Sequence, residues 1–375
     1  MKKIAYTATI PAVIHAFLRE HINAAASEYS VTLITHPANA GLLDDLPANF
    51  IPIAFERKIS PWRDLVTFIQ LIICFRRERF ALVHSIMPKT GLLTMLAGFL
   101  TGVPIRIHSF GGHVWSNKKG LQRGFLKGFD KLIVLFATQV LVDSASQRDF
   151  LVAEGVLYPE QALLLEHGSI CGVNPNRFKP NVEIRRTVRL EIQISMEQTV
   201  ILFLGRLNRD KGIPELAEAF ANLSVVCDDI LLLLVGAEED FPFTEVQKLC
   251  AARPELLRRV LFTAQPERYM ASADIFCLPS YREGFGLGII EAAACGVPAV
   301  ATRIDGITDA VDEGKTGLLV PAGDVTALTQ ALLKLIKDRQ LRQNMGQAAK
   351  ARALDLFSSE KITAALLKLY RERLL

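Results

Sequence analysis

The sequence has few of the features that mark metal-binding, disulfide-bonded or dinucleotide-binding proteins. Its cysteines form no Cys-x-x-Cys pair and have no zinc-like spacing to histidine (Cys74, Cys171, Cys227, Cys250, Cys277 and Cys295). Several lie in apolar runs, where free cysteine behaves as a small hydrophobic residue, so we expect a protein of the reducing cytoplasm. There is no Asp-x-Asp motif, and no glycine in 6–11, after the first apolar run. The second absence excludes a dehydrogenase with an N-terminal glycine fingerprint.

Long hydrophobic runs are also missing. The longest uncharged stretch, 90–105, has 16 residues with three glycines and Pro104 among them, whereas a membrane-spanning helix needs about 20 residues. This stretch predicts a buried helix followed by a turn. The first residues imitate a secretion signal only in part, because Pro11, His15 and Arg19 interrupt the apolar run. They favour a strand, a loop and a first helix.

Length and composition indicate a globular protein of two domains. The chain has 375 residues, of which 50% are hydrophobic and 22% charged. The formal net charge of +4 arises within the first 170 residues. This excess is too small to indicate nucleic-acid binding, but it favours anionic partners for the N-terminal half.

Short apolar runs alternate with amphipathic helical stretches along the whole chain, a pattern typical of parallel sheets covered by helices. Runs without alternation, such as 230–235, indicate strands buried on both faces. We therefore predict an α/β protein with two doubly wound, Rossmann-like parallel-sheet domains that face each other across a cleft. Strands are expected at 3–7, 31–35, 51–55, 82–86, 105–110, 139–143 and 163–167, then at 200–204, 231–235, 260–263, 275–279, 299–301 and 318–320.

The domain boundary is expected in the polar, proline-containing segment 174–197, which carries little apolar period and is the candidate linker. The prediction is an N-terminal domain over 1–175 and a C-terminal domain over 176–357. The last stretch, 358–375, has apolar residues at helical spacing, and we expect its helix to pack back on the N-terminal domain. Ligands of such sheets bind beyond the carboxyl ends of the strands.

The first segment that can carry chemistry is 203–212. A buried strand ends at Gly205, and two cations, Arg206 and Lys211, follow five positions apart just outside the sheet. The planar guanidinium and the compact ammonium can hold a diphosphate from two sides. The alternative is a solvated loop of mixed charge opposite Asp210.

The second segment, 278–292, joins a strand through a glycine-rich turn to a helix. Glycines allow the backbone to approach a ligand closely, and the N–H groups at a helix start favour a phosphate. Glu283 precedes the helix, and Glu291 lies roughly 7 Å along its axis at about 1.5 Å per residue. The two carboxylates can therefore meet different parts of an elongated ligand. The alternative is a helix with ordinary exposed glutamates.

Both segments resemble the GT-B retaining glycosyltransferases of family four, the glycosyl transferases group 1. The match runs from 202 to about 323 and includes the two glutamates eight positions apart, Gly-Val-Pro at 296–298 and Thr-Gly-Leu-Leu-Val at 316–320. The resemblance implies that Arg206 and Lys211 hold the donor diphosphate. It further implies that Glu291 binds the ribose hydroxyls and that Glu283 contacts the donor sugar.

The N-terminal half resembles the family less closely, as an acceptor-binding domain would. Segments 85–91 and 106–113 look like those of the bacterial surface-polysaccharide branch, which builds O-antigen and capsule. Many relatives carry a histidine where this chain has Gly111, and keep a second one where His113 stands. We take His113 as the substitute for the missing histidine, with a structural role as the alternative, and His108 as a strand residue.

The candidate site combines these residues. Its catalytic set is Glu283, Arg206, Lys211 and His113. The turn 284–287 is implied to line the sugar and phosphate through backbone N–H groups, and Thr263 is a plausible neighbour of the base. The donor-binding set is Gly205, Arg206, Lys211, Thr263, Glu283, Gly284, Phe285, Gly286, Leu287 and Glu291.

Metal-independent catalysis is expected, with no cofactor, because two cations and the helix start can stabilise the charge on the leaving diphosphate. Retention is implied by the family, and no carboxylate can be singled out as a covalent nucleophile. We therefore expect the leaving group to depart, and the acceptor to attack, on the same face of an oxocarbenium-like centre.

The resemblance implies a nucleotide diphosphate sugar as donor and a polyprenyl-diphosphate-linked saccharide as acceptor. We take the donor as UDP-linked, with an N-acetylhexosamine as the candidate sugar. Cations and apolar side chains mix over 115–131, which includes Trp115, and again over 68–80. Such a mixture suits peripheral contact with the inner face of an anionic cytoplasmic membrane. The alternative is core helices with solvated ends.

Two other functions fit parts of the pattern. A nucleotide-sugar epimerase can share the same two-domain architecture, because fold alone does not settle chemistry. A non-catalytic sugar-nucleotide-binding scaffold is favoured only by Gly111, since a scaffold has no need of all four charged residues in the two motifs.

Overall fold

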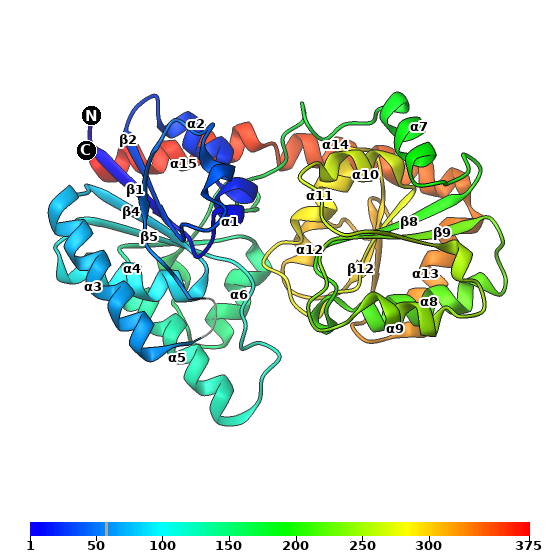
Figure 1. Cartoon of the computed structure of the whole chain (residues 1–375), viewed down its shortest axis with the longest axis horizontal. Coiled ribbons are helices and arrows are strands. Elements are labelled where there is room, and N and C mark those ends of the chain that lie inside the picture. The colour runs from blue at the N-terminus through cyan, green and yellow to red at the C-terminus, as the bar shows by residue number, and fades with distance from the viewer. Residues whose placement is uncertain (57–58) are drawn as a thin grey trace. The chain divides into compact units, whose positions relative to one another are not determined.

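A computed structural model describes residues 1–56 and 59–375 of the chain. These residues form two compact units (Figure 1). Unit 1 comprises Met1–Gly172 and the C-terminal segment Ser359–Leu375, and unit 2 comprises Val173–Ser358. Each unit is an α/β structure built on one parallel sheet.

The sheet of unit 1 has seven strands in the order β3-β2-β1-β4-β5-β6-β7, and all neighbours are parallel. The order reverses between β1 and β4, as in doubly wound sheets. The strands are β1 (Lys3–Thr7), β2 (Ser30–Thr35), β3 (Asn49–Pro52), β4 (Leu82–Ile86), β5 (Ile105–Phe110), β6 (Gln139–Val142) and β7 (Ala162–Leu164).

Helices cover both faces of this sheet. Alternate strand residues point to opposite faces, so Ile4 and Tyr6 enter one core cluster with α1, α2 and α15, whereas Ala5 enters the other with α3, α4, α5 and α6. The helical segments are α1 (Pro11–Phe17), α2 (Arg19–Ala25), η1 (Ala40–Leu43), α3 (Pro61–Glu78), α4 (Pro88–Leu100), α5 (Gly120–Phe136), α6 (Ala145–Ala153), η2 (Pro159–Gln161) and α15 (Ser359–Leu374).

The C-terminal helix α15 belongs to unit 1 although it follows unit 2 in sequence. It packs against α2, and its Tyr370 is fully buried. The Tyr370 hydroxyl donates to Tyr6 Oη at 3.1 Å and lies 2.5 Å from His84 Nδ1. Ser109 Oγ lies 2.7 Å from the other ring nitrogen of His84. A hydrogen-bonded chain of neutral groups therefore joins α15 to three strands of the sheet.

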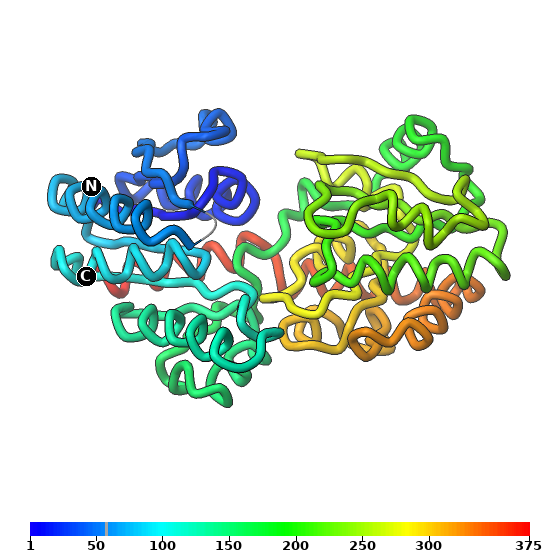
Figure 2. The backbone as a smooth tube through the Cα atoms, turned by 60° about the horizontal axis from the view of Figure 1, so that its bottom comes forward, coloured from blue at the N-terminus to red at the C-terminus, as the bar shows by residue number. Residues whose placement is uncertain are grey.

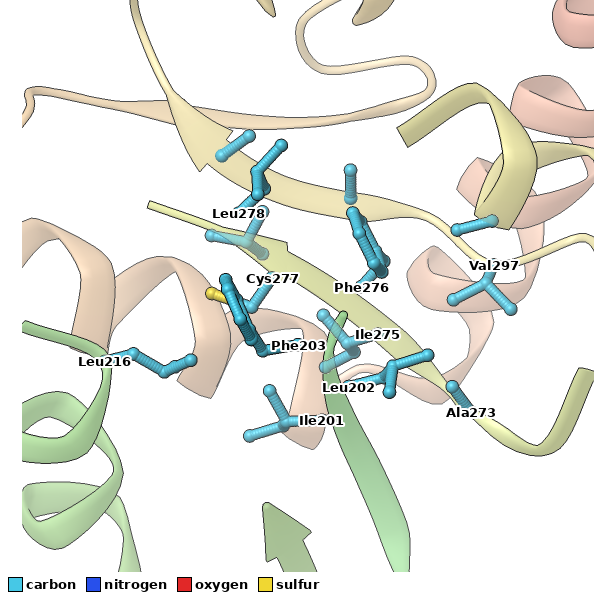
Figure 3. Packing of buried hydrophobic residues seen from close by; sticks show 14 of the residues in the cluster. Ile201, Leu202, Phe203, Leu216, Ala273, Ile275, Phe276, Cys277, Leu278 and Val297 are labelled. Atoms are coloured by element: carbon cyan, nitrogen blue, oxygen red, sulfur yellow. The ribbon is translucent and has the colours of Figure 1, made fainter. Parts of the chain in front are cut away.

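The sheet of unit 2 has six parallel strands in the order β10-β9-β8-β11-β12-β13, with the reversal between β8 and β11. In Figure 3, Ile201–Phe203 of β8 and Ile275–Leu278 of β11 pack together in a wholly apolar cluster. The strands are β8 (Thr199–Leu204), β9 (Ile230–Val235), β10 (Leu257–Val260), β11 (Ile275–Leu278), β12 (Ala299–Thr302) and β13 (Gly317–Val320).

Helices cover both faces of this second sheet as well (Figures 1 and 2). The buried face of α8 alone contributes six apolar residues to the core of unit 2. The helical segments are α7 (Val182–Glu191), η3 (Arg209–Lys211), α8 (Ile213–Ser224), α9 (Phe243–Leu249), η4 (Pro254–Leu256), α10 (Pro266–Ser272), α11 (Leu287–Ala294), α12 (Ile307–Ala310), α13 (Val325–Lys337) and α14 (Arg339–Leu356).

Every strand predicted from the sequence is present, although two are displaced and the strand expected at 163–167 is the shorter Ala162–Leu164. The strand expected at 51–55 is Asn49–Pro52. The apolar residues Ile53 and Phe55, which suggested a later end, follow the strand and pack into the core. The strand expected at 260–263 is Leu257–Val260, and Leu261 and Phe262 are exposed.

The predicted linker 174–197 is wrong, because it contains the helix α7. This helix is fixed to unit 2 by charge rather than by an apolar stripe: Arg185 and the fully buried Arg189 both pair with Asp274, at 2.7 and 2.6 Å. Apolar periodicity could not show a helix of this kind. Trp115, expected at a basic and apolar surface, is fully buried instead. The stretch 90–105 does form the expected buried helix and turn, and none of the described helices is long and apolar enough to cross a membrane.

Candidate active site

The predicted donor residues lie in unit 2, where the strand order reverses. Strand β8 leads into the loop 205–212, and its neighbour β11 leads into the loop 279–286. Both loops follow the carboxyl ends of parallel strands, so they emerge at the same edge of the sheet. This reversal point is where doubly wound sheets bind ligands.

Two glycines allow the segments around this edge to touch. Gly212 has φ +70°, and a Cβ there would lie 2.1 Å from the carbonyl oxygen of Pro279. Gly236, after β9, has φ +139°, and its Cβ would lie 1.9 Å from the carbonyl oxygen of Gly205. No other residue type fits either contact, because such distances are shorter than any side chain tolerates. The glycines therefore bring Lys211 close to the loop that carries Glu283.

Lys211 and Glu283 form a direct ion pair between the two loops. The Lys211 Nζ bonds Glu283 Oε1, and the Ser280 hydroxyl donates to the same oxygen at 2.8 Å. The Lys211 backbone N–H is capped by the side chain of Asn208 at 2.9 Å, which fixes the turn η3. The pair is only partly covered, with side chains 22% and 14% exposed, so both groups remain accessible to a ligand.

The same two loops are tied together a second time through Asp210. Its carbonyl accepts the Tyr281 N–H at 2.9 Å, and its carboxylate pairs with Arg282 at 2.8 Å. Asp210 therefore has its partner on the other loop, although its side chain is still 44% exposed. These contacts hold the Lys211–Glu283 pair in a fixed position.

Arg206 lies at the same edge but turns towards the loop after β9. Its Nη1 bonds both carboxylate oxygens of Glu239, at 2.6 and 2.5 Å, and Asn208 Nδ2 donates to Glu239 at 2.7 Å. The Arg206 side chain is 47% exposed. The structure therefore does not bring Arg206 into contact with Lys211 or Glu283, and a ligand that engages it competes with Glu239.

The turn 284–287 leads directly into α11. Gly286 is the N-cap, with φ +76° and no side-chain cap, so the first N–H groups of the helix are not closed off by a side chain. Gly306 approaches from the loop after β12; a Cβ there would lie 2.5 Å from the Gly284 carbonyl. Phe285 is buried and packs on Phe357, with ring centroids 5.1 Å apart. Only the backbone of this turn is therefore suited to meet an anion.

Glu291 lies inside α11 and is poorly solvated. Burial raises the pKa of its carboxyl to about 8; the nearby Arg177 lowers this pKa and Glu267 raises it. Arg177 pairs with Glu267 at 2.9 Å and donates to the carbonyl of Ala264 at 3.0 Å. The carboxyl is thus held mostly neutral at pH 7, beside an ion pair.

Thr263 belongs to the same region through that ion pair. Its hydroxyl accepts the N–H of Gln265 at 2.9 Å and so closes a tight turn. Arg177 donates to the carbonyl of Ala264 in the same turn. Thr263 and Glu291 are therefore linked through Arg177 and Glu267, not by a direct contact.

His113 lies in unit 1, within a buried aromatic cluster of Phe110, Trp115 and Phe150. It is 5% exposed, and its Nδ1 lies 3.1 Å from the carboxylate of Asp130, which also accepts the Trp115 indole N–H at 2.7 Å. Among the described residues its Nε2 has no partner. These contacts support a structural role for His113 in unit 1. His108 is a strand residue of β5, as expected.

Several residues of this region are absent from the sequence prediction. Asn208 and Ser280 stand inside the two motifs and could have been found by asking which side chains cap the turns. Glu239 follows the end of β9, so the rule that ligands bind at strand ends points to it. Arg177 and Glu267 carry no sequence signal, because residues 90 apart meet only after folding. Over the described residues 1–56 and 59–375, no three His, Cys, Asp or Glu side chains are grouped as metal ligands would be.

Comparison with known proteins agrees with this geometry. Residues 185–352 match the family model "Glycosyl transferases group 1", and residues 18–165 match "Glycosyl transferase 4-like domain". The capsular polysaccharide biosynthesis glycosyltransferase CapM of Staphylococcus aureus is 29% identical over 328 residues, which cover 87% of this chain and 85% of CapM. The UDP-Gal:alpha-D-GlcNAc-diphosphoundecaprenol alpha-1,3-galactosyltransferase of Escherichia coli is 24% identical over 84% of this chain and 82% of its own.

Solved structures show the same fold. HepE of Anabaena, solved in complex with UDP, superposes with a TM-score of 0.82 at 18% identity, over 99% of this chain and 100% of HepE. Sucrose-phosphate synthase from Thermosynechococcus elongatus superposes with a TM-score of 0.80 at 23% identity, over 99% of both chains. Fold and site thus define a GT-B glycosyltransferase. The chain belongs to family four of these enzymes, with the group 1 domain in unit 2.

Proposed function

We propose that the protein is a retaining glycosyltransferase of bacterial surface polysaccharide biosynthesis. It moves a sugar, which we take to be an N-acetylhexosamine, from a UDP-linked donor to a polyprenyl-diphosphate-linked saccharide. Unit 2 binds the donor and unit 1 the acceptor. The observation that carries the proposal is the Lys211–Glu283 pair, held by Ser280 beside the uncapped start of α11.

The relatives support this choice of substrates. HepE, with the same fold, binds UDP and UDP-glucose in its solved complexes. The E. coli relative is named for a UDP-linked sugar donor and a diphosphoundecaprenol-linked acceptor, and CapM for capsular polysaccharide biosynthesis. A soluble donor and a lipid-linked acceptor are therefore the substrate classes that the related enzymes favour.

In the proposed mechanism, fixed positive groups stabilise the departing nucleotide diphosphate. Lys211 and the backbone N–H groups at the start of α11 meet the diphosphate, and Arg206 joins them when it leaves Glu239. Charge grows on the leaving group in the transition state, so donors already in place lower the barrier without reorganisation. This arrangement requires no metal ion, and we propose that catalysis is metal-independent.

The two glutamates take different parts of the donor. Glu283, paired with Lys211 and Ser280, accepts hydrogen bonds from hydroxyl groups of the sugar, while Glu291, in the second turn of α11, holds the ribose. The largely neutral carboxyl of Glu291 can both donate and accept a hydrogen bond there. The leaving phosphate deprotonates the acceptor on the face it departs from, which retains the anomeric configuration.

The proposed acceptor is bound by unit 1 at the membrane. A polyprenyl-linked saccharide stays at the bilayer, so the enzyme acts at the inner face of the cytoplasmic membrane as a peripheral protein. His113, the candidate substitute for the histidine missing at Gly111, acts on the acceptor side only if its unpartnered Nε2 is reached by substrate.

The test is a transfer assay with purified protein in EDTA. A panel of UDP-, GDP- and ADP-sugars is offered with and without a polyprenyl-diphosphate-linked N-acetylhexosamine, and the anomeric configuration of any product is read by NMR. The proposal predicts an α-linked product from one UDP-sugar, formed only with acceptor. Donor consumption without acceptor and with an altered sugar would indicate an epimerase. Binding of UDP without turnover on any acceptor would favour the scaffold.

A further inference from the structure

Helix α3 of unit 1 is apolar on two opposite sides. Leu71, Cys74 and Phe75 are buried against the sheet. The outward side carries Trp62, 75% exposed, and Ile73, 60% exposed. Leu65, Val66 and Ile69 lie between them at helical spacing and are 42 to 48% exposed. A helix at the surface of a globular protein normally presents polar residues outward. The outward side of α3 is therefore unusual.

The neighbouring helices extend this exposed apolar surface. Helix α4 packs against both α3 and α5, and all three cover the same face of the sheet (Figures 1 and 2). Helix α4 ends at the exposed Phe99 and Leu100, and α5 exposes a stripe of four large apolar residues. We call this surface the α3–α5 face: Trp62, Leu65, Val66, Ile69, Ile73, Phe99, Leu100, Leu121, Phe125, Leu132 and Leu135, of which Leu121 is 94% exposed.

The α3–α5 face gathers eleven exposed large apolar residues on three neighbouring helices. Scattered exposed hydrophobic residues are normal, but a monomer rarely leaves a contiguous apolar patch of more than a few hundred Å² uncovered. By contrast, the helices α13 and α14 of unit 2 expose no large apolar residue. Such a concentration of exposed apolar residues is typical of an interaction surface.

The charges around the face indicate what it binds. Segments 61–79 and 114–136 hold nine Lys and Arg against three acidic residues. Of the acidic residues, Asp130 is buried, and Asp64 and Glu78 are already paired. Five cations are exposed and make no ion pair with a described residue: Arg76, Arg79, Lys118, Lys119 and Lys131.

We propose that the α3–α5 face docks on an anionic lipid bilayer, a step that rests on the lipid-linked acceptor of the proposed function. The apolar side chains enter the boundary between head groups and acyl chains, while the long cationic side chains reach the head groups. Trp62, at the start of α3, suits that boundary because its ring is amphipathic. Two copies of this chain would bring two cationic faces together, so the charge favours an anionic partner over a second copy.

The test measures vesicle binding by the full chain without substrates. Vesicles of 30% phosphatidylglycerol in phosphatidylcholine are compared with pure phosphatidylcholine at low and high salt. The chain has two tryptophans, and Trp115 is fully buried, so a blue shift of the emission on binding reports Trp62. The Trp62→Phe variant checks this assignment.

Two variants probe the face, and each has a matched control. Ile69→Ser with Ile73→Ser removes apolar contact on α3, and Val182→Ser with Val225→Ser makes the same kind of change at exposed sites of unit 2. Lys118→Glu, Lys119→Glu and Lys131→Glu reverse three cations, and Lys315→Glu, Lys334→Glu and Lys337→Glu do so in unit 2.

The proposal predicts salt-sensitive binding to the anionic vesicles, a blue-shifted emission, and at least a tenfold loss of binding in both face variants but in neither control. If the chain does not bind anionic vesicles, both the docking proposal and the peripheral membrane location are wrong. The proposed transferase activity is tested separately by the transfer assay. Binding that persists in both face variants would overturn the face alone. If light scattering shows a dimer that the face variants dissociate, and no vesicle binding is found, the face serves self-association instead.

Discussion

The two units share a parallel, doubly wound sheet but use polar residues in opposite ways. Unit 2 places ion pairs at the carboxyl ends of β8, β9 and β11, where Lys211, Glu283 and Arg206 remain accessible. In unit 1, strands β4 and β5 instead carry buried histidines that stay neutral, because burial lowers the pKa of His84 to about 3 and of His108 to about 4. One architecture thus carries the charged candidate site in one unit and a network of neutral histidine hydrogen bonds in the other.

A second contrast concerns buried carboxyls. Burial raises the pKa of Asp143 in unit 1 and of Glu291 in unit 2 to about 8. Glu291 has the charged neighbours Arg177 and Glu267, whereas burial alone acts on Asp143. A poorly solvated carboxyl beside an ion pair is typical of a ligand site, and one without charged neighbours is a cost to the fold. The comparison therefore favours Glu291 over Asp143 as a ligand-site residue, and the role of Glu291 stays a prediction.

The largest effect is expected from Glu283→Gln. The amide keeps the shape of the side chain but loses the charge that holds Lys211, and its contacts to the sugar weaken. We expect kcat for sugar transfer to fall by about 10²–10³-fold, the usual cost of losing one transition-state contact of this kind. Glu313→Gln, in an exposed pair with Arg303 of the same unit, should change the rate less than twofold. Equal rates in both variants would remove Glu283 from the site.

Gly212→Ala tests whether the loops need their close contact. A methyl group there would lie 2.1 Å from the Pro279 carbonyl at φ +70°, so unit 2 should lose at least about 3 kcal/mol of stability, within the range of severe backbone and packing conflicts. Gly155→Ala in unit 1 has a similar φ of +62° with no atom within 4 Å, and should cost only about 1 kcal/mol. Denaturant unfolding by circular dichroism measures both. A Gly212→Ala variant as stable as Gly155→Ala would contradict the described loop geometry.

Tyr370→Phe tests the neutral network of unit 1. It removes the hydroxyl that joins His84 to Tyr6 and leaves a buried ring nitrogen without its partner. We expect a loss of about 1–3 kcal/mol. Both tryptophans lie in unit 1, so fluorescence-monitored unfolding reports this unit. If the mutation changes the unfolding midpoint no more than Tyr158→Phe at an exposed site, α15 does not hold the sheet through this hydrogen bond.

The smallest effect is a pH dependence. The Asp143 carboxyl binds its proton more tightly in the folded chain, with a pKa of about 8, than in the unfolded chain, where the pKa is near 4. Its contribution to stability is therefore fully present below pH 4 and declines as the pH rises towards 8, by about 1 kcal/mol between pH 7 and 8. Asp143→Asn should flatten this decline in fluorescence-monitored unfolding. An unchanged slope would mean that the carboxyl is not protonated at pH 7.

Much of the fold could be predicted from the sequence because its strands are continuous apolar runs. The predictions failed for Ile53 and Phe55, which are apolar because they pack in the core and not because they belong to a strand. They also failed for α7, which is held to its unit by the ion pair of Arg189 and not by an apolar face. The donor residues could be located because two contiguous motifs carry them. The direction of Arg206, the network of Arg177 and the burial of Trp115 could not, since each depends on residues that only folding brings together.

The central claim is that unit 2 holds a nucleotide diphosphate through Lys211 without a metal ion. Calorimetric titration of UDP into the full chain in EDTA tests it most directly, with Lys211→Ala compared with Lys337→Ala at an exposed position of α13. Loss of one charge-assisted hydrogen bond of about 2 kcal/mol predicts roughly thirtyfold weaker binding for Lys211→Ala and no change for Lys337→Ala. Equal UDP affinity in the two variants, or binding that EDTA abolishes, would contradict the account.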